Sequence, residues 1–168
     1  MLAANPAVNP VRGVPAPVTP EGTPTGTPAL LLHLCRRHPE TGLAPPDDPC
    51  ALAECNGFNA HFATTSRVAH AHGRRGGRRA DDPAAWEALR RQVPGPVGGC
   101  FACSGDHCRR GPRGRGERHT ASDACLFVLG SRMEADGVDP SRFPKVRNRR
   151  ERIRARPAAL RALAAPGA

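Results

Sequence analysis

The sequence predicts a small, mostly α-helical protein with irregular Cys/His segments held by metal ions and a disordered N-terminal arm. Three observations lead to this prediction. Only 28 of the 168 residues are Leu, Val, Phe or Ile, below the ~20% at which charged chains tend to be disordered. Seven cysteines gather mainly in two clusters, and zinc–thiolate bonds stabilise small domains that lack a large core. Helical spacing and capping residues occur around the second cluster.

Composition divides the chain into five segments. Residues 1–28 hold seven prolines, which predicts an extended, disordered arm. Residues 29–72 hold three cysteines and five histidines and form the first predicted metal module. Residues 73–80 are an Arg/Gly linker, residues 81–135 combine short helices with the second cluster, and residues 136–168 form a basic helical segment.

The first cluster has the spacing Cys-x2-His-x11-Cys-x4-Cys and predicts a zinc site. Zinc prefers four nitrogen or sulfur ligands in a tetrahedron, usually supplied as two close pairs joined by a loop. The loop between the pairs, residues 39–49, is polar and rich in proline. The predicted ligands are Cys35, His38, Cys50 and Cys55.

The second cluster begins with a Cys-x2-Cys pair flanked by glycines, which allow a tight turn around a metal ion. Its predicted zinc ligands are Cys100, Cys103, Cys108 and His119. The same cysteines could instead hold an iron–sulfur cluster, and the two clusters could combine into one site. Cys125 is interpreted as a small buried thiol.

Two helices are predicted around the second cluster. The first follows Asp82 as the cap and ends before Pro94, with Trp86 anchored in the core. Residues 98–118 have no periodicity and are expected to be irregular. The second helix starts at the capping box of Thr120 and Asp123 and reaches about residue 135.

A third helix, from about Pro144 to Arg156, carries most of the functional prediction. Residues 142–156 hold eight basic residues against one acid in a chain whose net charge is +10, and arginine clusters bind nucleic-acid phosphates. Val146 and Ile153 are expected to face the protein. The predicted contacts to DNA or RNA phosphates come from Lys145, Arg147, Arg149, Arg150, Arg152 and Arg154.

The predicted function is therefore a small zinc-binding regulatory or accessory protein that contacts nucleic acid. One alternative is a zinc-tied adaptor for a protein partner. Another is a metal-dependent nuclease of the His-Asn-His kind that uses Asn59 with His61, His70 or His72. The arginine-, alanine- and proline-rich composition is also typical of reading frames without an evolved function. Enzymatic activity is not favoured, because phosphate-loop, dinucleotide and nucleophile-elbow motifs are absent.

The same patterns predict a soluble, intracellular protein, either cytoplasmic or associated with a nucleoid or nucleus, with no membrane partner. No apolar run approaches the ~18 residues of a membrane span, and the first 28 residues do not have the pattern of a signal peptide. In that setting an odd number of cysteines indicates metal ligands or free thiols rather than a set of disulfides.

Overall fold

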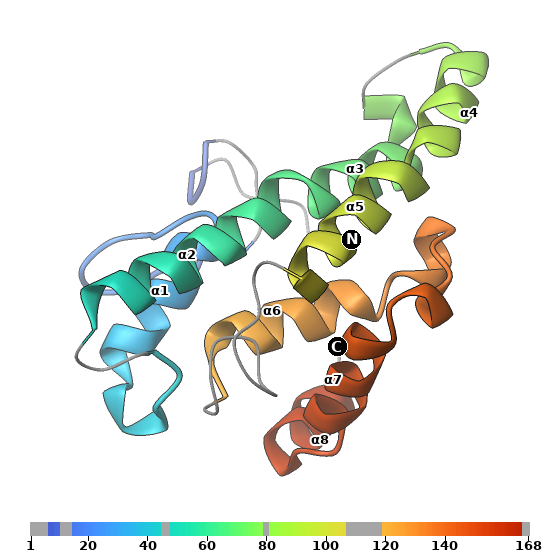
Figure 1. Ribbon diagram of the computed structural model, residues 1–168. Coiled ribbons are helices and arrows are strands. Elements are labelled where there is room, and N and C mark those ends of the chain that lie inside the picture. Colours follow the sequence, from blue (N-terminus) through green and yellow to red (C-terminus); the bar gives the residue numbers. More distant parts are fainter. Residues whose placement is uncertain (1–6, 11–14, 45–47, 79–80, 107–118, 166–168) are drawn as a thin grey trace.

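The computed structural model describes residues 7–10, 15–44, 48–78, 81–106 and 119–165 (Figure 1). Within these ranges the chain is built from α-helices and short 3-10 helices, and it contains no β-strand. A single antiparallel bridge joins Thr19 and Gly22 ahead of the first helix. None of the helices in the described ranges is both long and apolar enough to cross a bilayer.

Proline stands first or second in six of the eight α-helices, where its fixed backbone angle suits the first turn. The α-helices are α1 (Thr27–Arg37), α2 (Pro49–Thr64), α3 (Ser66–Arg74), α4 (Pro83–Gln92), α5 (Pro94–Asp106), α6 (Ala121–Gly130), α7 (Pro144–Arg154) and α8 (Pro157–Ala164). The 3-10 helices are η1 (Pro39–Thr41), η2 (Gly76–Arg78), η3 (Glu134–Asp136) and η4 (Pro140–Arg142).

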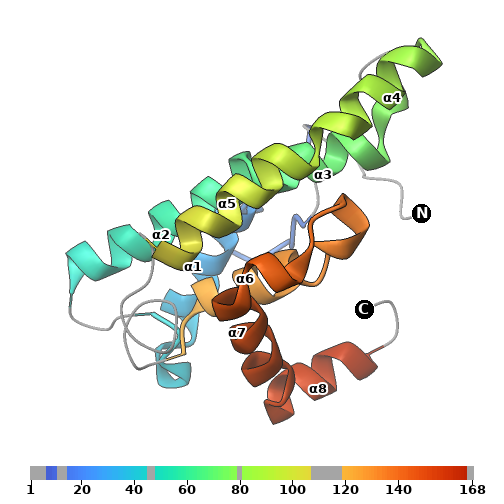
Figure 2. The same ribbon diagram turned by 45° about the vertical axis from the view of Figure 1, so that its right-hand side comes forward.

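Two long rods organise the helices. Helices α2 and α3 follow one another in one rod, and α4 and α5 form a second rod that returns alongside it (Figures 1 and 2). Helix α1 packs against α2, while α6 packs against both α2 and α7. Helix α8 follows α7 and lies at the edge of the molecule (Figure 2).

The core lies where the two rods meet α6 and α7, and aromatic rings dominate it. Phe62 of α2 is fully buried, with its ring centroid 4.8 Å from that of Phe58 and 5.6 Å from that of Phe101 on α5. Leu126 of α6 and Met133 complete the centre, each only 1% exposed. Aromatic side chains bury large areas, so a few of them build a core despite the low content of large apolar residues.

The capping predictions from the sequence are confirmed. Asp82 caps α4 by accepting a hydrogen bond from the backbone N–H of Ala84 at 3.0 Å. Thr120 and Asp123 form the capping box of α6, in which the Asp123 carboxylate accepts from the Thr120 N–H at 2.9 Å. Helix α6 ends at Gly130, however, five residues earlier than expected.

The prediction of metal-tied, irregular Cys/His segments is wrong. Cys35 lies in α1, and Cys50 and Cys55 lie in α2. Residues 98–106, expected to be irregular, belong to α5, so Cys100 and Cys103 are helical as well. These cysteines occupy regular helices whose packing does not depend on a metal knuckle.

The expected disordered arm also differs from the structure in its described part, residues 7–10 and 15–28. Asn9 is buried, with 5% of its surface exposed. Thr19 and Gly22 exchange two backbone hydrogen bonds of 2.9 and 3.1 Å. Glu21 accepts from Arg37 of α1 at 3.2 Å, so this stretch packs on the helical body.

Trp86 lies outside the core, although the sequence predicted it as an anchor. It is 38% exposed and packs on the glycines of the Arg/Gly segment. A Cβ atom at Gly76 would lie 3.0 Å from Trp86 Cγ, and one at Gly77 would lie 3.1 Å from Cζ2. These glycines therefore let the chain pass close to the indole ring.

Replacing Phe62 by alanine should lower the free energy of unfolding by about 3–5 kcal/mol, because it removes a fully buried ring and leaves a cavity. Chemical denaturation followed by far-UV circular dichroism measures the change. Phe127→Ala is the comparison, since Phe127 is only partly buried and should cost less. Equal losses in the two variants would contradict this account of the core.

Candidate functional site

The start of α1 is a helix N-terminus without a side-chain cap. Its N-cap residue, Gly26, has a φ of 86°, and no side chain among the described residues accepts a hydrogen bond from the first turn. The first turn also contains no acidic residue. The backbone N–H groups of Thr27 and Ala29 are left to bind another acceptor, and such helix starts attract anions.

Three other helices have side-chain caps at their first turns. Asp48 accepts from the N–H groups of Cys50 and Ala51 at the start of α2, at 2.9 and 3.0 Å. Asp82 and the capping box of Thr120 and Asp123 serve α4 and α6 in the same way. The first turn of α1 differs from these three and, like those of α3, α7 and α8, has no side-chain cap.

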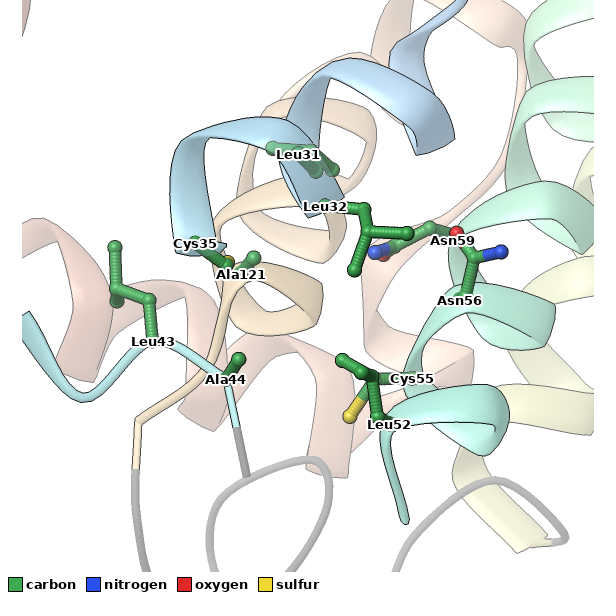
Figure 3. A pocket seen from close by; sticks show the side chains of 10 residues that line it. All are labelled: Leu31, Leu32, Cys35, Leu43, Ala44, Leu52, Cys55, Asn56, Asn59 and Ala121. Atoms are coloured by element: carbon green, nitrogen blue, oxygen red, sulfur yellow. The ribbon is translucent and has the colours of Figure 1, made fainter. Parts of the chain in front are cut away.

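A small cavity of about 20 Å³ lies between α1, α2 and α6 (Figure 3). Leu31 and Leu32 line it from α1, and Asn56 and Asn59 line it from α2. Its volume suits one water molecule at most. The cavity is thus a packing defect beneath α1 and is too small for a substrate.

Two cysteines also line this cavity, Cys35 from α1 and Cys55 from α2. Each is 7% exposed. Burial raises the pKa of the Cys35 thiol, and the neighbouring Cys55 raises it further. A thiol with a raised pKa stays neutral and unreactive, so Cys35 is a structural residue.

A larger groove, of about 440 Å³, opens between the junction of α3 with the second rod and the η3 turn. Arg74 and Arg90 line one part of it, and Glu134 and Asp136 line another. Behind the groove, His70 Nδ1 lies 2.5 Å from the buried carboxylate of Asp136. This contact ties α3 to η3 and fixes the groove wall.

A buried ion pair joins α6 to α7. Arg149 Nε lies 3.4 Å from Asp123 Oδ1, and the side chains are 5% and 1% exposed. His119 approaches the other oxygen of the same carboxylate at 3.8 Å. Asp123 therefore neutralises a buried arginine in addition to closing the first turn of α6.

A Cys–His contact joins α2 to α5. Cys100 Sγ lies 3.2 Å from His61 Nε2, and Cys100 is only 2% exposed. Cys103 follows one helical turn later and is partly exposed. None of the cysteines in the described ranges forms a disulfide.

The zinc prediction is wrong. No group of three or more Cys, His, Asp or Glu side chains in the described residues could hold a metal ion. Cys35 and Cys55 are buried under α1, Cys50 is exposed, and His38 contacts Glu40 at 3.1 Å. His119 lies beside Asp123, apart from the Cys100–His61 contact, and Cys108 lies outside the described residues. Helical packing separates side chains that the linear spacing had paired.

The prediction of phosphate contacts along α7 is wrong for two residues on direct structural grounds. Arg149 is buried against Asp123. Arg150 donates to the Gly130 carbonyl at 3.0 Å and to Glu134 at 3.2 Å. Lys145, Arg147, Arg152 and Arg154 are exposed. The placement of Val146 and Ile153 against the protein is confirmed, with 4% and 6% of their surfaces exposed.

No protein-family model and no curated protein matches the chain, but solved structures do. A glutathione transferase homolog from Sulfitobacter, with bound glutathione, is 33% identical and has a TM-score of 0.86. The match covers 94% of this chain and 76% of that chain. The chain belongs to the glutathione transferase family.

Two further structures of the glutathione transferase fold are similar to the chain. A sphingomonad glutathione S-transferase complexed with glutathione is 23% identical, with a TM-score of 0.79, and the match covers 94% of this chain and 76% of that one. A maleylacetoacetate isomerase from Methylobacterium extorquens, with bound malonate and glutathione, is also 23% identical, with a TM-score of 0.70 and coverage of 97% and 79%.

Membership of the glutathione transferase family overturns the predicted function. The prediction of a zinc-dependent, nucleic-acid-binding protein is wrong, and so are the alternatives of a protein adaptor and a nuclease. The alternative of a reading frame without an evolved function is wrong as well. The residues proposed for the nuclease have other contacts, since His61 meets Cys100 and His70 meets Asp136. Helix α1 was not among the predicted helices, although Gly26-Thr27-Pro28 before an apolar run is a helix-start signal.

Replacing Asp123 by asparagine should lower the free energy of unfolding by about 3–5 kcal/mol, because it leaves the buried Arg149 without a countercharge. Urea denaturation measures the change. Asp139→Asn is the matched control, since Asp139 caps η4 at the surface and asparagine caps equally well. A similar cost in both variants would show that the Asp123–Arg149 pair contributes little.

Cys125 should resist alkylation in the folded protein. Burial raises the pKa of its thiol to about 11, so the thiolate stays scarce at about pH 8 and becomes more abundant as pH rises toward that value. Iodoacetamide labelling followed by peptide mass spectrometry should show exposed Cys50 modified at least about tenfold faster. Equal labelling rates in the folded chain would contradict this expectation, and denaturation should make the rates similar.

Proposed function

We propose that the protein binds glutathione at the start of α1, as a member of the glutathione transferase family. The observation that carries this proposal is the similarity to the Sulfitobacter homolog, which holds glutathione and matches 94% of this chain. The isomerase from Methylobacterium extorquens also holds glutathione, which supports the same ligand class.

The chemistry of glutathione fits the open first turn of α1. Glutathione is a tripeptide with a carboxylate at each end, and helix N-termini bind carboxylates through backbone N–H groups and the helix dipole. Thr27 and Ala29 supply these N–H groups, while Pro28 between them has none. Nothing lies within 4 Å of the position that a Cβ atom of Gly26 would occupy, so a ligand can approach the backbone.

The cavities described above fit this role less well. The cavity beneath α1 has room for only a water molecule. The groove beside η3 is large enough for a small molecule, but its two carboxylates are already engaged by His70 and Arg150. The groove is therefore the alternative location for the glutathione site, and the experiment must distinguish it from the start of α1.

Thr27→Asp should weaken glutathione binding by about tenfold or more, because it places a carboxylate against the carboxylate of the ligand. Aspartate is favourable in the first turn of a helix, so α1 should remain folded. Isothermal titration calorimetry with reduced glutathione measures the affinity, and circular dichroism checks the helix content.

Thr27→Asn is the matched control, since asparagine has the shape of aspartate without its charge. It should bind glutathione within about threefold of the unmodified chain. If the two variants bind equally well, the site is not at α1. If the unmodified chain shows no heat of binding with millimolar glutathione, the proposed function itself fails.

A further inference from the structure

Three side chains at the contact between α2 and α5 are not used by the proposed glutathione site. They are Cys100 and Cys103 of α5 and His61 of α2. The start of α1 binds its ligand through backbone groups, so these thiols serve no purpose there. Their arrangement points to a chemistry of its own.

The two thiols differ in access and in surroundings. Cys100 is 2% exposed and lies in the core cluster with Phe62 and Phe101. Its Sγ atom is 3.2 Å from His61 Nε2, so the imidazole can take the thiol proton when its Nε2 is unprotonated. Cys103 is partly exposed and can meet a small molecule from solvent.

Helix geometry places the two cysteines within reach of each other. Residues three apart on an α-helix lie on the same face, with Cα atoms about 5 Å apart. Disulfides span Cα distances of about 4.4–6.8 Å. Closing a bond between Cys100 and Cys103 therefore requires only a local adjustment of one turn.

The glycines of α5 make that adjustment easy. Glycine is a poorer helix former than alanine, and α5 contains Gly99 beside Cys100 and Gly105 after Cys103. Nothing lies within 4 Å of where a Cβ atom would stand at either position, so packing does not require these glycines. They leave the turn that holds the two thiols deformable.

We propose that Cys103 and Cys100 form a redox-active dithiol that exchanges with small disulfides, with His61 as the base for the second step. This site lies apart from the proposed glutathione site and does not depend on it. The substrate class is a low-molecular-weight disulfide, of which glutathione disulfide is one example.

The exchange proceeds in two balanced steps. The Cys103 thiolate attacks one sulfur of the small disulfide, forms a mixed disulfide and releases the first small thiolate. His61 then takes the proton of Cys100, and the Cys100 thiolate attacks the Cys103 sulfur. The Cys100–Cys103 bond forms and the second small thiolate leaves. In total, the two protein thiols are oxidised to one disulfide and the small disulfide is reduced to two thiols.

The other cysteines in the described ranges do not offer this combination. Cys50 is exposed, but its neighbours one turn away on α2 include no second cysteine. Cys35 and Cys55 are both buried, and burial raises the pKa of Cys35. Burial likewise raises the pKa of Cys125. Among these, only the α5 pair combines an accessible thiol with a buried one beside a base.

The test treats the full chain with glutathione disulfide or hydroxyethyl disulfide and maps the products by tandem mass spectrometry. The unmodified chain should form a Cys100–Cys103 disulfide with either reagent. Cys100→Ser should instead accumulate the mixed disulfide at Cys103, and Cys103→Ser should leave Cys100 unmodified. Hydroxyethyl disulfide separates this proposal from glutathione binding, since it lacks the carboxylates of glutathione.

Two variants test the base and the deformable turn. His61→Gln should slow conversion of the mixed disulfide to the internal one by about tenfold or more. Gly99→Ala should also slow formation of the Cys100–Cys103 disulfide while leaving the rate of attack by Cys103 unchanged. This variant provides the test if His61→Gln does not fold. The proposal would be overturned if Cys103 formed a disulfide with Cys108, or if Cys100 were modified in Cys103→Ser. It would also be overturned if the Cys100–Cys103 disulfide formed at an unchanged rate in every folded variant of His61 and Gly99.

Discussion

The start of α6 is the point on which the rest of the fold depends. The Ala121 N–H donates to the Leu43 carbonyl at 3.0 Å, and the Ser122 hydroxyl donates to the Cys55 carbonyl of α2 at 3.3 Å. Asp123 closes the capping box and meets Arg149 of α7. One buried turn thus holds the segment after α1, the helix α2 and the helix α7. Because unsatisfied buried polar groups are costly, this turn restricts how these elements can pack.

The low content of large apolar residues is compatible with a fold because the core is concentrated. Phe58, Phe62 and Phe101 are at most 4% exposed, and Phe143 packs against them. The exposed helices contribute little to this core: α4 and α8 contain no buried residue. The fraction of large apolar residues is an average over the whole chain. It therefore underestimates the stabilisation by burial in the part of the chain where these residues cluster.

Local signals in the sequence predicted local structure well. Asp82 before Pro83, and Thr120 with Asp123, correctly marked the starts of α4 and α6. Tertiary contacts could not be deduced in the same way. The glycines and cysteines of α5 indicated a metal-binding loop because their helix is stabilised by packing of Val97, Cys100 and Phe101 rather than by propensity. Helix α1 was not predicted from the sequence, and the absence of a side-chain cap at its start became clear only in the structure.

The basic helix α7 shows why a charge count must follow an analysis of helical faces. Arg149 is three residues after Val146 and four before Ile153, so all three share the face that is buried against the protein. An arginine on such a face needs a countercharge, and Asp123 supplies it. Arg150 donates hydrogen bonds to the Gly130 carbonyl at the end of α6 and to the Glu134 carboxylate. The position of an arginine relative to the apolar stripe therefore distinguishes a structural ion pair from a surface charge, which the total of +10 does not.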